Sequence, residues 1–343
     1  MKTILKFLIY FFYSKIILYS IFYLKLKKNN ILYPGHFGFG DFVEFCYLMR
    51  SKIEKNKIFC YSALQYEIAN FFFKKKNIKT SLVLMPKFMN ETHIGYNFLL
   101  KSKIFETTKY PVWKLGDGTR VPSHDFFIRT KKSVQYTISR INPNIVSIDL
   151  FKLFQKPTLL LFIKNFSKKK NNHINFQVRQ TRNLDKIIRL INFVNKKNIN
   201  TLILGKNNEH FIEYISKVIF NKNWKNVYFF NKLSKNYSIM DQAYVALHAL
   251  GYIGSASGAN IFCSILKKRL VIIDCPYYYS NKYWDNYTFL HKKLYNKINK
   301  SFKKFIWQKY YNPATYKIIE TNYKEIKKAV QKDLLCIDNR KLY

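Results

Sequence analysis

The chain has 343 residues, 48% of them hydrophobic and 18% aromatic, with 60 Lys and Arg against 19 Asp and Glu. This length and apolar content exclude a disordered chain and are sufficient for two domains with a sizeable core. The net charge of +41 has two explanations, which are compositional drift towards Lys, Asn, Ile, Phe and Tyr, or attraction to an anionic partner.

The sequence contains neither a known nucleic-acid-binding motif nor a cysteine-based metal or disulfide site. The sequence carries no nucleic-acid-binding signature, because the lysines are dispersed and no RNP motif, zinc-finger spacing or recognition helix is present. The cysteines are odd in number and form no C-x-x-C pair, so they indicate neither a zinc site nor a disulfide framework. We expect free thiols in a reducing compartment. The cysteines are Cys46, Cys60, Cys263, Cys275 and Cys336.

The N-terminus is strongly apolar over residues 3–24, and a lysine-rich stretch follows it. Lys6 and Lys15 interrupt the run, and no signal-peptide cleavage site follows. Three readings stay open: a helix lying in the membrane interface, a membrane span, or a helix covered by protein. We assign residues 1–28 to a membrane-associating helix. By the positive-inside rule the rest of the chain is then cytoplasmic, at the inner face of an anionic membrane.

The first of two glycine-rich windows covers residues 35–41, GHFGFGD, between an expected strand at 29–33 and an expected helix from Phe42 to about Lys55. A strand, a glycine turn and a helix in this order are typical of the ligand-facing edge of an α/β unit. Asp41 is either the N-cap of the helix, in a capping box with Glu44, or a general base. The acceptor-side loop candidates are His36, Gly38 and Gly40.

The rest of the first half is less regular. We expect strands at 57–61 and 81–85, a helix at 64–75, and a loop at 111–123. A buried strand at 159–163 precedes the polar break SKKKNN at 167–172. We therefore assign residues 29–160 to a first Rossmann-like domain.

The second half alternates strands and helices, which implies a parallel sheet with right-handed crossovers. The expected strands are 173–178, 201–204, 226–230, 252–253 and 270–274. The expected helices are 184–196, 210–220, 239–250 and 260–266. Residues 173–322 thus form a second Rossmann-like domain, and a helix at 323–343 is expected to pack back on the first one. The fold class is α/β, with two Rossmann-like domains facing each other across a cleft.

The second half also holds the candidates for binding a phosphorylated ligand. Arg179 and Arg182 follow an expected strand, where arginine clamps a diphosphate, unless they are ordinary surface arginines. The second glycine window, residues 251–258, leads into a helix, where backbone N–H groups bind anionic oxygens, unless it is an ordinary turn. The candidate residues are Gly254, Ser255, Ser257 and Gly258 of this window, and Asn260 just after it.

Several motifs are absent from the sequence. It contains no D-x-D pair for a nucleotide-bound Mg²⁺, no Walker A loop, no G-x-S-x-G elbow and no complete dinucleotide fingerprint. We therefore expect neither a metal site nor a cofactor, with arginines and helix dipoles replacing the cation.

These pieces together resemble GT-B glycosyltransferases of the lipopolysaccharide heptosyltransferase-like type, glycosyltransferase family 9. The family's "G-x-G-D" loop, whose Asp is the proposed base, is matched by 38–41, and its donor-site "G-x-D-S-G-x-x-H" by 254–261. A basic residue at a strand end is matched by Arg179 or Arg182. The motif Asp is Ala256 here, and the motif His is Ile261. A group of surface-polysaccharide glycosyltransferases is similar too.

The resemblance implies transfer of a sugar from a nucleotide-diphosphate sugar to a glycan or lipid-linked acceptor in cell-surface polysaccharide synthesis, with inversion and without a metal. Asp41 would be the base. Ala256 and Ile261 leave open a non-catalytic relative that binds a glycan or nucleotide. A basic nucleic-acid-binding protein is the weaker alternative.

Overall fold

The computed structural model describes two sets of residues. In the first half it describes residues 5, 8, 9, 12, 31–32, 39–40, 42–43, 46, 57–60, 63–73, 79–82, 112–114 and 120–122. In the second half it describes 147–165, 180–205, 209–234, 238–276, 286–305, 312 and 314–336. The chain divides into two compact units, Met1–Gln135 and Tyr136–Tyr343.

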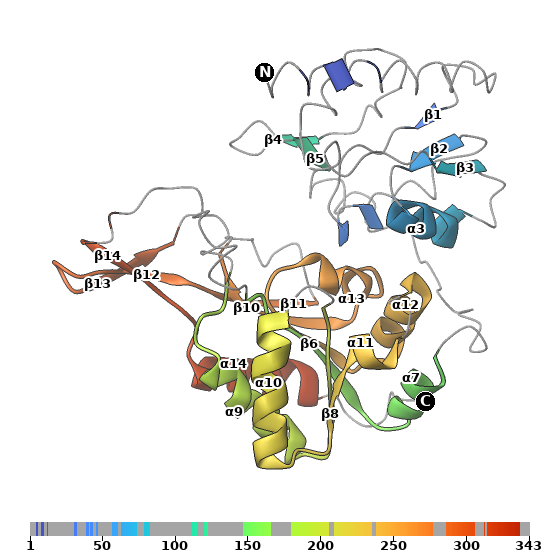
Figure 1. Cartoon of the computed structure of the whole chain (residues 1–343). Coiled ribbons are helices and arrows are strands. Elements are labelled where there is room, and N and C mark those ends of the chain that lie inside the picture. Colours follow the sequence, from blue (N-terminus) through green and yellow to red (C-terminus); the bar gives the residue numbers. More distant parts are fainter. Residues whose placement is uncertain are drawn as a thin grey trace. The chain divides into compact units, whose positions relative to one another are not determined.

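The first unit contains a parallel sheet of three strands in the order β1-β2-β3 (Figure 1). Its strands are β1 (Ile31–Leu32), β2 (Lys57–Cys60) and β3 (Lys79–Leu82), and α3 (Ala63–Phe73) follows β2. These elements confirm the expected strand–helix order. The expected loop at 111–123 contains an antiparallel pair instead, β4 (Val112–Lys114) and β5 (Arg120–Pro122), on either side of the Gly-Asp-Gly turn signal.

Helical positions near the N-terminus include Leu5, Leu8, Ile9 and Phe12, and all four side chains are exposed. Phe39 and Gly40 are helical too, so that helix begins earlier than the expected Phe42. Its buried residues Phe42, Val43 and Cys46 belong to the core of the unit. Among the described residues, no helix combines the length and apolarity needed to cross a bilayer.

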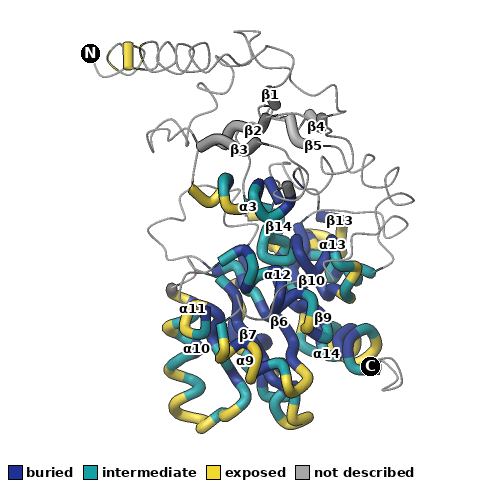
Figure 2. Tube along the Cα trace, turned by 90° about the vertical axis from the view of Figure 1, so that its right-hand side faces the viewer, coloured by how far each residue is buried: buried dark blue, intermediate teal, exposed yellow. Residues whose placement is uncertain are grey.

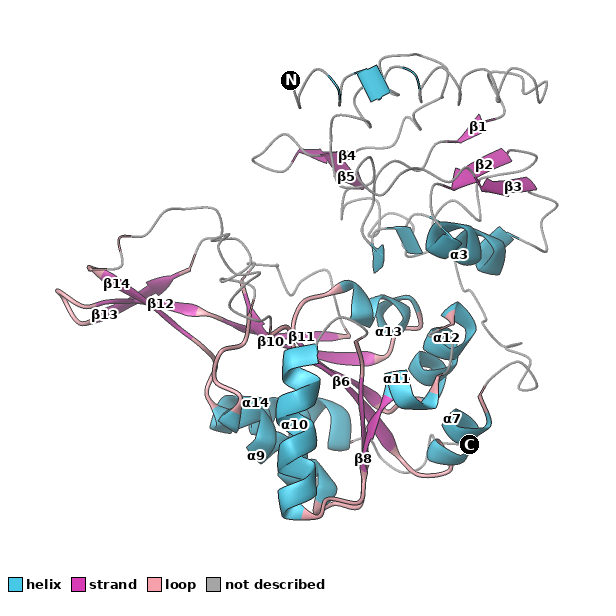
Figure 3. Cartoon of the chain, in the orientation of Figure 1, coloured by secondary structure: helices cyan, strands magenta, loops and turns pink. Residues whose placement is uncertain are grey.

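The second unit is built on a six-stranded parallel sheet (Figure 3), and its strands follow the order β11-β10-β9-β6-β7-β8. Numbered from its first strand, this is the order 6-5-4-1-2-3 of a doubly wound nucleotide-binding fold. The strands are β6 (Thr158–Phe162), β7 (Asn200–Ile203), β8 (Val227–Phe229), β9 (Gly251–Gly254), β10 (Arg269–Cys275) and β11 (Tyr287–His291).

Helices cover both faces of this sheet, and its inner strands β6, β7, β9 and β10 are largely buried (Figure 2). On one face, α9 (Asp185–Asn195), α10 (Glu209–Lys222) and α14 (Tyr323–Val330) pack on Leu159 and Leu161. Since side chains alternate along a strand, Leu160 faces the other side. There α12 (Ile239–His248) and α13 (Ile261–Ile265) contact the sheet. The remaining helices are α7 (Ile148–Leu153), α11 (Phe230–Leu233), η5 (Gly258–Asn260) and η7 (Gln331–Leu335).

Two expectations about domain boundaries differ from the structure. We expected residues up to 160 to belong to the first domain, but β6 is a central strand of the second unit's sheet. The polar stretch 167–172 resembled a linker although it follows a core strand. The C-terminal helix was expected to pack on the first domain. Instead α14 packs on α9 within the second unit, because Ile326, Ala329 and Val330 complete the apolar core there.

A second antiparallel sheet, in the order β13-β12-β14, follows the parallel one. Its strands are β12 (Lys293–Asn296), β13 (Ser301–Lys304) and β14 (Tyr316–Ile319). Cys263 and Cys336 are free thiols, as expected. Burial raises the pKa of the Cys263 thiol to about 12, which makes this cysteine unreactive.

Two neighbouring strands of the parallel sheet approach each other closely at Gly254, the last residue of β9. Its φ is +154°, and a Cβ atom there would lie 2.0 Å from the carbonyl oxygen of Phe162 on β6. We expect Gly254→Ala to lower the free energy of unfolding by about 3 kcal/mol or more, since it adds backbone strain to a steric clash. Urea unfolding would measure the change.

The matched control is Gly258→Ala, because Gly258 is helical and alanine accepts that conformation. Equal losses of stability in the two variants would contradict the prediction.

Candidate functional site

The parallel sheet has a topological switch point between β6 and β9. From β6 the chain continues to β7 on one side, and from β9 it continues to β10 on the other. In doubly wound sheets the connections that leave such a point in opposite directions open a crevice outside the carboxyl ends of the strands, where ligands bind. The two loops at this point are residues 163–165 and 255–258, and they define the candidate site.

Ser255 joins these two loops. Its backbone N–H donates to the Phe162 carbonyl at 2.8 Å, and its hydroxyl accepts from the backbone N–H of Lys164 at 2.9 Å. The hydroxyl of Tyr252 donates to the Ser255 carbonyl at 2.9 Å. Ser255 is buried, so the structure uses its side chain to fix the loops to each other.

Residues 256–258 of the glycine window are half-buried, and they lead into helical structure as expected. The hydroxyl of Ser257 accepts from the backbone N–H of Ala259 at 3.3 Å and caps η5, in which Gly258 and Asn260 lie. The following helix α13 has only five residues, so its dipole is small. The binding capacity of this loop therefore rests on its own polar groups.

A chain of hydrogen bonds places an imidazole beside the first loop. The side-chain amide nitrogen of Asn165 donates to the Thr181 carbonyl at 2.9 Å, and its oxygen lies 3.0 Å from Nδ1 of His210. Because an amide oxygen only accepts, Nδ1 of His210 carries the hydrogen. The Nε2 atom is thereby the acceptor of a neutral ring and a second donor when the ring is charged. His210 is exposed at the start of α10.

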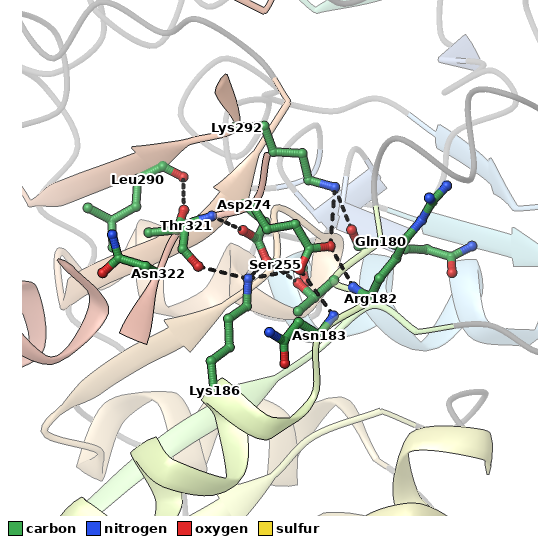
Figure 4. Close-up of polar contacts among 12 residues, drawn as sticks. Gln180, Arg182, Asn183, Lys186, Ser255, Asp274, Leu290, Lys292, Thr321 and Asn322 are labelled. Carbon is green, nitrogen blue, oxygen red and sulfur yellow. Dashed lines mark hydrogen bonds and ion pairs between the residues drawn. The ribbon is translucent and has the colours of Figure 1, made fainter. Parts of the chain in front are cut away.

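A buried ionic cluster lies at the same carboxyl edge and holds the segment that contains Thr181 (Figure 4). Nζ of Lys186 donates to Asp274 at 2.7 Å, to Glu320 at 3.0 Å and to the Thr321 carbonyl at 3.0 Å. Asp274 also accepts from the Thr181 hydroxyl at 2.8 Å and from the backbone N–H of Thr321 at 2.8 Å. All three ammonium hydrogens of Lys186 are therefore satisfied.

Lys292 completes the cluster. Its Nζ donates to the Gln180 carbonyl at 2.6 Å and lies 3.9 Å from a Glu320 oxygen. Burial lowers the pKa of the Lys292 ammonium, an effect that Asp274 and Glu320 oppose. Two lysines and two carboxylates make the cluster neutral, which limits the cost of burying it.

Glu320 has a pKa below its ordinary value. Burial alone would raise the pKa, but Lys186, Lys292 and the backbone N–H groups of Arg182 and Asn183 outweigh it. Those N–H groups donate to the two Glu320 oxygens at 2.6 and 3.1 Å. Glu320 thus fixes the backbone at Arg182.

The structure describes only some of the site residues that were predicted from the sequence. Arg182 is exposed, and its side chain extends away from the ionic cluster (Figure 4). Ala256 is half-buried and Ile261 buried, at the two positions where the family motif has Asp and His. Gly40 is helical and half-buried. The remaining four candidates, Asp41, His36, Gly38 and Arg179, lie outside the described residues.

Three side chains of the site were missed by the sequence analysis: Lys164, Asn165 and His210. A signal for the first two was present, because they directly follow the buried strand expected at 159–163. They were overlooked because that strand was assigned to the first domain. His210 begins a predicted helix, but only the folded chain shows that it meets Asn165.

The arrangement suits an anionic ligand. Lys164, Arg182 and His210 supply cationic or N–H donor groups near the switch point, while Asp274 and Glu320 are engaged in the cluster. Among the residues that the structure describes, no group of three or more His, Cys, Asp or Glu side chains is arranged to hold a metal ion.

The sequence matches no protein-family model and no curated protein. Among solved structures, the chain is similar to the glycosyl transferase family 9 protein from Veillonella parvula DSM 2008, with 12% identity over 89% of this chain and 96% of that one and a TM-score of 0.49. It is also similar to the E. coli heptosyltransferase WaaC with ADP-2-deoxy-2-fluoro heptose, with 11% identity over 73% and 69% and a TM-score of 0.32.

A third similar structure is the Methanocaldococcus jannaschii UDP-GlcNAc 2-epimerase in complex with UDP-GlcNAc and UDP. It is 10% identical over 68% of this chain and 64% of that one, with a TM-score of 0.29.

The depressed pKa of Glu320 predicts a loss of stability in acid. The ionised Glu320 stabilises the fold fully above its unfolded pKa of about 4.3, and this contribution is lost as the pH falls through the lower folded pKa. We expect Glu320→Gln to cost about 2 kcal/mol at pH 7, less than the roughly 3–5 kcal/mol of a fully buried pair.

Urea unfolding of wild type and variant between neutral and acid pH would measure this, with Glu213→Gln on α10 as a control for the loss of one exposed carboxylate. The two curves should converge in acid. A constant difference between wild type and Glu320→Gln down to the lowest pH would contradict the prediction.

Proposed function

We propose that the chain is a glycosyltransferase that moves a sugar from a nucleotide-diphosphate sugar to a glycan or lipid-linked acceptor. The observation that carries the proposal is the position of the second glycine window. This segment, whose motif resembles the donor site of family 9, lies at the switch point of a doubly wound parallel sheet. Lys164, Asn165 and His210 lie around the same point.

The donor diphosphate is the part of the substrate that this edge suits. Arg182, or Arg179 where the family resemblance puts the basic residue, would pair with its oxygens together with Lys164. Nε2 of His210, when protonated, would donate to the same group. These donors would neutralise the charge that develops on the leaving nucleoside diphosphate, so the proposed transfer needs no metal ion.

In the proposed reaction, the acceptor hydroxyl oxygen attacks the anomeric carbon from the face opposite the diphosphate. The new carbon–oxygen bond forms as the bond to the diphosphate oxygen breaks, which inverts the configuration. The acceptor proton passes to Asp41, and the nucleoside diphosphate leaves with the electron pair.

We further propose that the acceptor is made at the inner face of the membrane, in the synthesis of cell-surface polysaccharide or lipopolysaccharide. Leu5, Leu8, Ile9 and Phe12 follow the i, i+3, i+4, i+7 spacing of one helix face and are 60%, 44%, 40% and 62% exposed. Such a face suits the interface of a membrane, and nearby lysines suit its anionic lipids. This segment would hold the chain near a lipid-linked acceptor.

A panel of ADP-, GDP-, UDP- and CMP-linked sugars tests the donor site by thermal stabilisation, because a ligand that binds only the native state stabilises it. We expect stabilisation by one nucleotide family. His210→Ala should raise the Kd of that ligand about tenfold, since a hydrogen bond to a charged group is lost.

The matched control is Lys217→Ala, which removes an exposed cation from the same helix and should leave the Kd unchanged. No stabilisation by any nucleotide sugar would count against the donor site.

The role of Asp41 separates a transferase from a non-catalytic relative. We expect Asp41→Asn to keep nucleotide-sugar binding and to slow transfer by about 10²–10⁴-fold, because the general base is lost. Release of nucleoside diphosphate in the presence of acceptor would measure turnover. Unchanged turnover in a folded Asp41→Asn protein would overturn this mechanism, and binding without any turnover in the wild type would favour the non-catalytic reading.

A further inference from the structure

The antiparallel sheet β13-β12-β14 carries exposed apolar side chains that the core of the second unit does not use. Ile298 is 77% exposed, Phe302 63% and Ile318 37%. Among the large hydrophobic residues that the structure describes, only Phe220 on α10, at 87%, is more exposed than Ile298. This sheet lies beyond the six parallel strands, as Figure 1 shows. Ile318 is in register with Leu294 and therefore faces the opposite side of the sheet from Phe302. Ile298 and Phe302 lie close together in the chain, and exposed apolar residues that gather in this way mark an interaction surface.

Ile298 lies at the apex of the β12–β13 hairpin, and the turn that presents it is braced. The side-chain oxygen of Asn296 accepts from the backbone N–H groups of Ile298 at 2.9 Å and Asn299 at 3.4 Å. The Ser301 hydroxyl donates to the Asn299 side chain at 2.6 Å. The backbone of this turn is therefore already ordered, so burying Ile298 against a partner costs little conformational entropy.

Phe302 lies on the strand just beyond this turn. It pairs with Tyr295 on β12, with the ring centroids 5.1 Å apart, and Lys317 of β14 pairs with Tyr295 from the other side. One face of the small sheet thus places an aromatic pair and an exposed lysine next to the apex.

The charge around the apex has one sign. Between residues 286 and 319 the sequence contains eight lysines and no Asp or Glu. Lys297, Lys300, Lys303 and Lys317 are exposed. Lys300 has a φ of +51°, a region that glycine and asparagine prefer, so the turn places a lysine where those residues would suit the backbone better.

We propose that this hairpin tip, consisting of Lys297, Ile298, Lys300, Phe302 and Lys317, docks on the surface of an anionic lipid bilayer. Ile298 and Phe302 enter the headgroup layer, and the lysines pair with lipid phosphates while their stems lie along the apolar boundary. An aliphatic apex favours lipid over nucleic acid, because a polyanion has no apolar phase for isoleucine to enter. This surface lies in a different unit from the N-terminal helix and does not depend on the transferase proposal.

Sedimentation of the full chain with vesicles of phosphatidylcholine, with and without phosphatidylglycerol, tests the proposal. We expect binding to the mixed vesicles only, falling as salt rises. The double variant Ile298→Asp, Phe302→Ser should lower the partition coefficient about tenfold, because it removes the two inserted side chains. Lys300→Asn should lower the partition coefficient less than the double variant does. Asparagine suits the left-handed backbone conformation at this position.

Phe220→Ser is the matched control, since it removes the most exposed large apolar side chain from another surface of the same unit. It should leave the partition unchanged, and circular dichroism with urea unfolding should show that every variant folds. The N-terminal helix is intact in all of them, so equal vesicle binding of wild type and the double variant would overturn the proposal.

Binding of a single-stranded oligonucleotide is measured in parallel. A double variant that loses the oligonucleotide but keeps the vesicles would overturn the proposal in favour of nucleic acid. Stabilisation by nucleotide sugars is measured on the same proteins and should not change, which keeps this test separate from that of the donor site.

Discussion

A single buried carboxylate, that of Asp274, connects the parts of the second unit on which the candidate site depends. It accepts hydrogen bonds from Thr181 and Lys186, which are close together in the sequence, and from Thr321, which lies 135 positions after Lys186. Asp274 is the penultimate residue of β10, with a φ of +50°, and the register between β10 and β11 shifts there. An irregularity of this kind re-aims a side chain at the end of a strand.

The consequence reaches the site through Thr181. Its backbone N–H donates to the Lys164 carbonyl at 3.0 Å, and its carbonyl accepts from Asn165, which in turn positions His210. The carboxylates of Asp274 and Glu320 are thus engaged in hydrogen bonds that fix the backbone around the site. The side chains left to face an incoming ligand are cationic or neutral, so a site built this way favours an anion over a cation.

The secondary structure between β6 and β10 was largely predictable, because the strands there are short apolar runs separated by helices with a clear 3.6-residue period. Helix α9 is an example, with Ile187, Leu190, Ile191 and Val194 all in the core. The strands β11 to β14 had no counterpart among the expected elements. β6 was recognised as a strand but assigned to the wrong side of a domain boundary. A polar run of lysines and asparagines has the same composition whether it links two domains or two elements of one sheet.

The candidate site was predictable only in part. The second glycine window was recognised because its glycines lie close together in the sequence, beside an apolar run. The short distance between the backbones of Gly254 and Phe162 explains why glycine occupies position 254. Ser255 was expected to face a ligand, whereas its hydroxyl joins two loops. The pairing of Asn165 with His210 spans 45 positions and has no local pattern.

The sequence by itself determined the α/β class, the order of most elements in the second half and the position of the glycine window, because these depend on local periodicity and backbone freedom. Only the tertiary structure decided the strand order that creates the switch point, the partners of Asp274 and the placement of Ile298 at an exposed apex. Those features depend on contacts between residues far apart in the chain, and neither composition nor periodicity encodes which distant residues meet.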